Sequence, residues 1–141
     1  MGVIARCKCP NNGLFVTSIV FLIVFLGSEL MFRMYDLYRI FPEVDIISHL
    51  LSGMTLGAGI YWIFTLNSVR KKALMAVFFT FVVGVIWEIL EMLEEKVVPN
   101  PPWLRDYFFY DGAFDILVMV IGSILAIDLI YMLRYKTKIL E

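Results

Sequence analysis

The residues best suited to chemistry in this chain are acidic side chains and a single histidine, embedded in long apolar stretches. They occur as pairs spaced three or four residues apart: Asp45 with His49, Glu88 with Glu91, and Asp111 with Asp115. This spacing places both members of a pair on one face of a helix. Ionisable groups within a membrane segment are energetically costly, which makes these residues candidates for a functional site.

Carboxylates gathered in a region of low dielectric repel one another, so either some are protonated or a cation neutralises them. Carboxylates combined with one imidazole suit a divalent metal ion such as Mg, Mn, Fe or Zn, and helical bundles build such sites from inward-facing side chains. The predicted metal ligands are Asp45, His49, Glu88, Glu91, Asp111 and Asp115. Six protein ligands leave no position for water on one ion, so we expect two metals or a division between ligands and a base. Glu88 and Glu91 are the candidate catalytic bases.

The composition is that of a membrane protein. Of the 141 residues, 61% are hydrophobic and 18% are charged, against about 45–50% and about 25% in soluble domains. Four apolar segments are long enough to cross a hydrocarbon core about 30 Å thick, at about residues 14–32, 44–66, 73–93 and 113–133. Because backbone polar groups in lipid must be satisfied within each segment, all four are expected to be helices. The predicted fold is an all-α integral membrane bundle of four transmembrane helices, forming one domain over residues 1–141.

The distribution of basic residues predicts the orientation of this bundle. Four spans place both termini and the loop between the second and third spans on one side, which carries eight of the 12 Lys and Arg residues. The positive-inside rule therefore puts both termini in the cytoplasm of a multi-pass plasma-membrane protein. Counting about 1.5 Å per helical residue places His49 and Glu88 about 7–8 Å below the outer surface. We expect the acidic residues and the histidine to converge in one layer of the outer half of the bilayer.

Three motifs in this order resemble a known family. They are Asp45-x3-His49-x3-Gly53, Trp87-Glu88-x2-Glu91, and Asp111-x3-Asp115 with Gly122 seven residues later. Over about residues 44–126, the chain resembles the DUF2238 family of predicted membrane proteins, which includes YjdF-like proteins and is loosely similar to VanZ-like proteins. Members of that family usually carry more membrane segments, and a glycine-rich loop where this chain has Pro99, Pro101 and Pro102. The resemblance implies no established reaction, but it implies that the motif positions form one site.

The predicted ligands also have structural interpretations. His49 can be a hydrogen-bonded packing residue, and Glu88 and Glu91 can belong to the charged end of the third helix. Asp111 can be the N-cap of the fourth helix, with its carboxylate accepting hydrogen bonds from free N–H groups, and a structural role also competes for Asp115.

Other features are open in the same way. Glu29 is either an outer ligand or the partner of Arg33 in an ion pair, and Asp128 can pair with a basic residue from the cytoplasmic end. The Gly53-x3-Gly57 pair is typical of close helix packing. Cys7 and Cys9 are too few for a zinc site. The aromatic segment around residues 103–110 is expected to lie flat on the outer surface and cover the site.

Three function classes fit these observations. The first is a metal-dependent hydrolase or transferase, whose site just below the headgroups would suit a lipid ester, a lipid phosphate or a polyprenyl phosphate. The second is an ion or metal transporter or channel, although Asp128 alone continues the acidic path into the inner half. The third is a structural membrane subunit. Membrane lipid is the expected partner, and a homo-oligomer would widen a transport path. Nucleic acid is not expected, because the basic residues are few and lie at the membrane boundary.

Overall fold

The structure is a computed structural model that describes residues 12–41, 43–64, 68–95 and 102–139. Side chains are described within these ranges for residues 13–38, 40–41, 43–64, 68–93 and 111–133. The predictions for Cys7, Cys9, Pro99 and Pro101, and those for the side chains of the aromatic segment 103–110, lie outside these residues.

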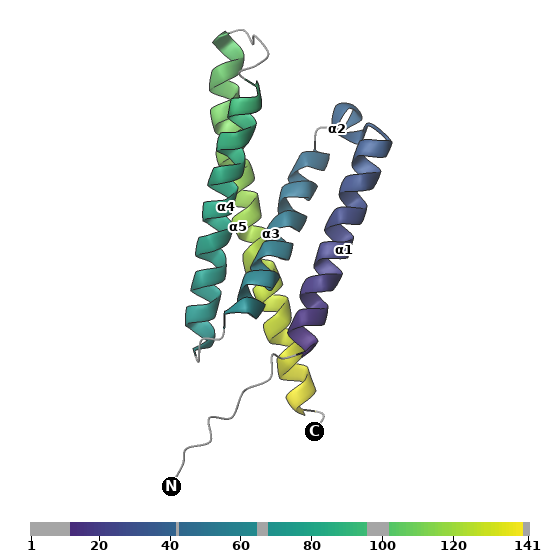
Figure 1. Ribbon diagram of the computed structural model, residues 1–141, viewed down its shortest axis with the longest axis vertical. Helices are drawn as coiled ribbons and strands as arrows, with labels where there is room; N and C mark the ends of the chain where they lie inside the picture. Colours follow the sequence, from purple (N-terminus) through teal and green to yellow (C-terminus); the bar gives the residue numbers. More distant parts are fainter. Residues whose placement is uncertain (1–11, 42, 65–67, 96–101, 140–141) are drawn as a thin grey trace.

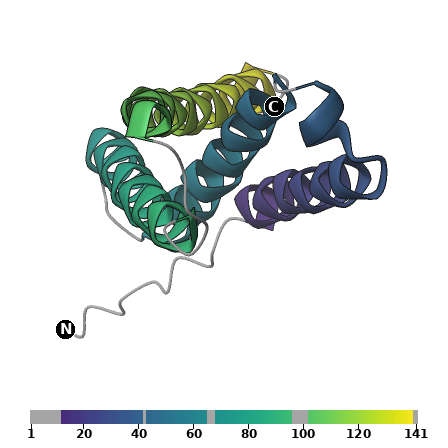
Figure 2. The same ribbon diagram turned by 90° about the horizontal axis from the view of Figure 1, so that it is seen from above.

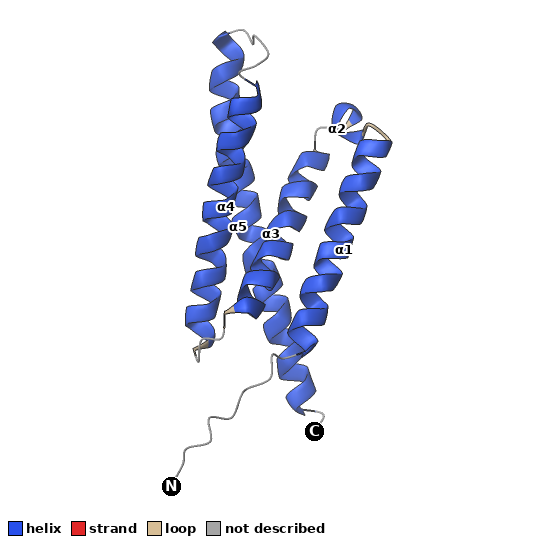
Figure 3. Cartoon of the chain, in the orientation of Figure 1, coloured by secondary structure: helices blue, strands red, loops and turns tan. Residues whose placement is uncertain are grey.

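Helices are the regular secondary structure of the described chain, as Figure 3 shows. They are α1 (Asn12–Met34), α2 (Leu37–Ile40), α3 (Val44–Ile63), α4 (Val69–Glu95) and α5 (Pro102–Ile139). The four long helices contain segments long and apolar enough to cross a membrane: Gly13–Met34, Val44–Ile63, Val69–Leu93 and Asp111–Leu133. The predicted all-α bundle with four transmembrane helices is confirmed. The side of the membrane on which the termini lie stays a prediction.

The start of α5 differs from the prediction. The sequence predicts a span beginning near residue 113 after a segment that lies flat on the surface, but α5 runs unbroken from Pro102. Proline suits the first turn of a helix, because the N–H that it lacks has no partner within the helix at that position. Asp111 therefore lies inside α5 and is not its N-cap.

The second long helix and the connector before it also differ in detail. α3 ends at Ile63 and not near residue 66, because Phe64 takes an extended conformation with φ −72° and ψ 117°. The connector contains the short helix α2, which follows Asp36 in the left-handed conformation at φ 51°. Aspartate tolerates this conformation better than most residues. The turn places α2 between the C-terminal end of α1 and the N-terminal end of α3 (Figure 1).

α3 is the central helix of the bundle. It packs against α1 on one side and against α4 and α5 on the other, and α5 crosses behind it (Figures 1 and 2). Two glycines make the crossing with α5 close: a Cβ at Gly53 would lie 2.7 Å from Met119 Cα, and one at Gly57 would lie 2.7 Å from Ser123 Cα. Gly53 and Gly57 therefore form a packing face, as the sequence predicts.

A layer of small polar side chains joins α4 to α5 below the predicted site. Thr80 and Ser123 are fully buried, and their hydroxyl oxygens are hydrogen-bonded at 3.3 Å. Together with the glycine contacts of α3, this layer fixes how the three helices lie relative to one another. Outside it, apolar side chains such as Ile23 and Leu74 are exposed, so the helices contact membrane lipid.

Candidate functional site

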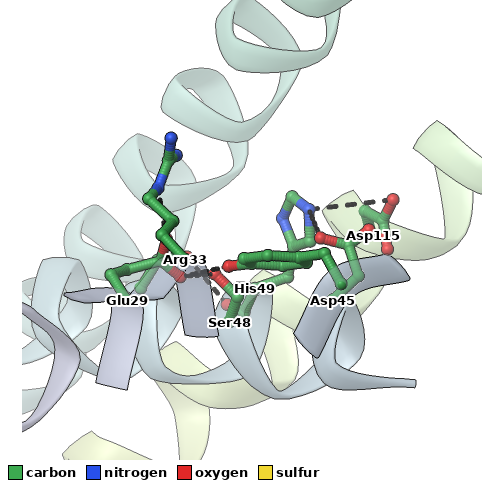
Figure 4. Close-up of polar contacts among 8 residues, drawn as sticks. Glu29, Arg33, Asp45, Ser48, His49 and Asp115 are labelled. Carbon is green, nitrogen blue, oxygen red and sulfur yellow. Dashed lines mark hydrogen bonds and ion pairs between the residues drawn. The ribbon is translucent and has the colours of Figure 1, made fainter. Parts of the chain in front are cut away.

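The first group at the site joins α3 to α5. His49 follows Asp45 by one turn of α3, and Asp115 lies one turn before the residue of α5 that contacts Gly53. His49 Nε2 lies 3.6 Å from Asp45 Oδ1 and 3.8 Å from Asp115 Oδ2 (Figure 4). One ligand atom from each of the three residues lies within 4.8 Å of the others. The group is well enclosed, because the side chains of His49 and Asp115 are 10% and 9% exposed.

These separations are longer than direct hydrogen bonds and leave room for an ion among the three side chains. Hydrogen bonds between nitrogen and a carboxylate oxygen are about 2.7–3.2 Å long, and both distances to His49 Nε2 exceed that range. Ligand atoms about 2.0–2.2 Å from one ion are themselves separated by about 3.3–3.6 Å in tetrahedral geometry, so a small inward movement of these side chains would bring them to that spacing. The arrangement of Asp45, His49 and Asp115 is therefore of the kind that could hold a metal ion.

A small acidic cavity adjoins this group between α3, α4 and α5. Its volume is about 210 Å³, and its lining contains five carboxylate side chains together with Met92 and Gly112; the acidic residues are Asp45, Glu88, Glu91, Asp111 and Asp115. Glu88 is 8% exposed, and its Oε1 atom is buried with no hydrogen-bond partner among the described residues. A buried carboxylate oxygen without a partner is uncommon in native proteins. Glu91, one turn further along α4, is exposed at the cavity.

A larger cavity of about 680 Å³ runs along α3 between α1 and α4. Its end near the start of α3 is polar, with Asp45, His49 and Glu91 in its lining, and further along α3 the lining is mostly apolar, with Ser52 and Thr55 as its polar members. The apolar lining residues are Leu22, Phe25, Leu56, Val83, Trp87 and Met119. Leu22, Val83 and Trp87 are also exposed, so the cavity communicates with the surroundings of the bundle. Asp45 and Glu91 line both this cavity and the acidic one.

Glu29 belongs to a separate polar group at the rim of the larger cavity. Its Oε1 atom accepts a hydrogen bond of 2.6 Å from the Tyr38 hydroxyl and another from the Ser48 hydroxyl, and its Oε2 atom lies 3.6 Å from Arg33 Nε. Figure 4 shows Glu29, Arg33 and Ser48 beside the group of Asp45, His49 and Asp115. Burial and the adjacent Glu29 carboxylate raise the pKa of Tyr38 to about 12, so its hydroxyl remains a donor at neutral pH. Of the two interpretations of Glu29, the ion pair with Arg33 is confirmed.

The six predicted ligands all line one or both of the two cavities. Three of them, Asp45, His49 and Asp115, lie close enough together to share one ion. Glu88, Glu91 and Asp111 lie around the acidic cavity and outside that group of three. Asp128 is exposed on α5 and lines neither cavity, and the basic side chains at residues 134–138 are outside the described set. The roles of all six residues as ligands or bases stay predictions.

Tyr38, Ser48 and Gly112 are site residues that the sequence analysis missed. Ser48 could have been found, because it lies three residues after Asp45 and therefore on a neighbouring part of the same helix surface. Tyr38 gave no such signal, because its place depends on the left-handed turn at Asp36. Gly112 lies between Asp111 and Asp115, and a glycine there gives no sign of a role in the sequence. In the structure, a Cβ at this position would lie 2.5 Å from Glu88 Oε2.

We compared the chain with known proteins and protein families. No curated protein and no solved structure matches it. The sequence model of the family described as "Predicted membrane protein (DUF2238)" matches residues 4–138, nearly the whole chain and all three acidic motifs. The chain therefore belongs to the DUF2238 family of predicted membrane proteins.

Proposed function

We propose that this protein is a metal-dependent membrane hydrolase or transferase that acts on a lipid phosphate or polyprenyl phosphate. The observation that supports this function best is the larger cavity, which joins the outer polar group to an apolar channel open at the side of the bundle. A lipid needs such a site, because its headgroup requires polar partners while its chains remain in an apolar environment.

The residues divide into three roles in this proposal. Asp45, His49 and Asp115 hold a divalent ion, in keeping with the spacing of their ligand atoms. Such an ion would polarise a phosphoryl oxygen and make a bound water more acidic. Glu91 accepts the proton from the attacking water, because it lines both the acidic cavity and the cavity assigned to the substrate.

Arg33 supports a phosphate as the headgroup. It lines the larger cavity near its outer end, and its guanidinium is largely exposed while it contacts Glu29. Arginine recognises phosphate oxygens through several N–H groups held in one plane. A lipid phosphate could therefore contact Arg33 without breaking the hydrogen bonds that Tyr38 and Ser48 donate to Glu29.

The experiment is a metal and turnover assay on the full chain in lipid nanodiscs. Elemental analysis should find a bound divalent metal, and adding phosphatidic acid or a polyprenyl phosphate should release inorganic phosphate. His49→Ala should lose the ion assigned to Asp45, His49 and Asp115, and with it the turnover. Glu91→Gln should retain the metal and lower kcat by about 10²- to 10³-fold, the range expected for loss of a general base. The matched control is Asp128→Asn, which changes an exposed acid outside both cavities.

The outcome also separates the alternatives. Metal flux into liposomes without turnover would identify a transporter, and a metal-free chain with neither activity would identify a structural subunit. Close packing of Gly53 on Met119 and of Gly57 on Ser123 lies directly below the site. A path across the membrane through a single chain therefore has less support than chemistry at the outer end.

A further inference from the structure

We propose that the 210 Å³ acidic cavity binds a second divalent cation, beside the one assigned to Asp45, His49 and Asp115. Glu88 and Asp111 would be ligands of this second ion alone, and Asp45 and Asp115 would face both ions. The inference rests on the proposed function only in placing the first cation.

The carboxylate of Glu88 is the observation that points to a ligand. The residue is 8% exposed and lines the cavity, yet its Oε1 atom has no hydrogen-bond partner among the described residues. A buried carboxylate oxygen loses its water on folding, and a hydrogen-bond donor, a proton or a cation must compensate for that loss. Gly112 faces the same carboxylate, and a Cβ there would lie 2.5 Å from Glu88 Oε2. The missing side chain leaves the carboxylate room within the cavity.

The charge of the cavity also favours a second divalent ion. Five carboxylates line it, so with all five ionised, one divalent ion would leave three negative charges and two would leave one. None of the described basic side chains lines the acidic cavity, and Arg33 lines the larger cavity, where it contacts Glu29. Because like charges in a region of low dielectric repel one another strongly, a second cation would stabilise the arrangement of α3, α4 and α5.

The two sites differ in chemistry. The first contains the imidazole of His49, which favours Zn, Mn or Fe, whereas the second offers carboxylate oxygen alone and favours Mg or Mn. In two-metal centres, the ions lie about 3.5–4 Å apart and together stabilise the attacking and leaving oxygens. Shared carboxylates such as Asp45 and Asp115 suit that spacing.

Mn²⁺ is a suitable probe because it fits both sites and is visible by electron paramagnetic resonance. The full chain in nanodiscs would be stripped with a chelator, dialysed against Mn²⁺ and measured for bound metal. The wild type should bind two Mn²⁺ per chain, with the spectrum of a coupled pair. Glu88→Gln and His49→Ala should each bind one Mn²⁺, with the spectrum of an isolated ion. Asp128→Asn should bind two, as a control for the loss of an acid elsewhere on α5.

One Mn²⁺ per chain in the wild type, unchanged by Glu88→Gln, would overturn the second site. Glu88→Met is the second variant, because methionine tolerates burial but supplies no carboxylate. If Glu88 holds no ion, Glu88→Met should be more stable than the wild type and should bind the same number of Mn²⁺ ions, and this result would also overturn the proposal. Loss of one Mn²⁺ in Glu88→Met would support the proposal. Two bound ions without lipid turnover would support the second cation site and contradict the proposed enzymatic function. Lipid turnover with one bound ion would support the enzymatic function and contradict the second site.

Discussion

Glu88 and Glu91 lie one turn apart on α4 and meet different surroundings. Glu88 is buried against Gly112, whereas Glu91 is exposed and reaches the lining of both cavities. Their spacing in the sequence predicts that both face the same way, and both do line the acidic cavity. It could not predict which of the two is buried and which is exposed, because that difference depends on the approach of Gly112 in α5 and on the end of the larger cavity.

The hydrogen bond from Tyr38 to Glu29 should make stability depend on pH. The pKa of Tyr38 is raised to about 12, chiefly by burial and then by its bond to Glu29, from about 10 in an unfolded chain. A raised pKa means that folding favours the protonated form. The stabilisation is therefore fully present below about pH 10 and is lost as the pH rises towards 12.

Thermal unfolding of the wild type and of Tyr38→Phe measures this effect. At pH 8 the variant should be less stable by about 1 kcal/mol, the typical net value of one hydrogen bond. Above pH 10 the difference should shrink, because the tyrosine of the unfolded chain ionises there while the folded wild type still holds the proton. A difference that stays constant up to pH 12 would contradict the role given to the hydroxyl.

At the scale of the elements, the site depends on how closely α3 crosses α5. His49 and Asp115 each lie one turn from the contact between Gly53 and Met119, so this contact sets the distance between imidazole and carboxylate. Hydropathy predicts the long helices because each must satisfy its own backbone in lipid. It does not predict α2 or the start of α5. Asp36 and Pro102 decide those boundaries through local backbone geometry, which a count of apolar residues does not record.

Gly53→Ala should disturb both stability and metal binding. A Cβ at Gly53 would fall against the Met119 backbone, which cannot move without shifting α5. The cost should be about 1–3 kcal/mol, as for other overpacked positions. Metal binding should weaken about tenfold, equivalent to about 1.4 kcal/mol, because the helices carrying His49 and Asp115 separate.

Gly59→Ala is the matched control on the same helix. A Cβ at Gly59 would meet nothing within 4 Å, and alanine favours a helix over glycine by up to about 1 kcal/mol. This variant should be slightly more stable, with unchanged metal affinity by calorimetry. Equal destabilisation by both substitutions would show that the close crossing does not position the site.

At the scale of the whole molecule, the four helices bring three distant motifs to one end of the bundle. The sequence predicts this layer from helical rise and from antiparallel spans, and the shared lining of the two cavities agrees with it. The sequence could not predict that there are two adjoining cavities, because the larger one depends on α1 lying beside α3. Hydropathy predicts how far a residue lies from the membrane surface, but it does not predict which helices are neighbours.

The predicted orientation has a direct test. In a background with Cys7 and Cys9 replaced by serine, Tyr35→Cys should react in intact cells with a maleimide that cannot cross the membrane. Tyr35 lies in the outer connector and is 63% exposed. Lys71→Cys, at the opposite end of the bundle and also exposed, should react only after permeabilisation. The reverse pattern would place the acidic site on the cytoplasmic side.

The wall common to the two cavities has a thermodynamic consequence. Asp45 and Glu91 belong to both linings, so a molecule in the larger cavity would contact carboxylates that also face the proposed ions. Occupancy of one cavity would then alter affinity in the other, and linkage would make the effect reciprocal. A lipid that tightens cation binding about tenfold is itself held about tenfold more tightly when the cation is present, a coupling of about 1.4 kcal/mol. The fraction of the protein that binds a cation would then depend on the lipid composition of the bilayer as well as on the cation concentration.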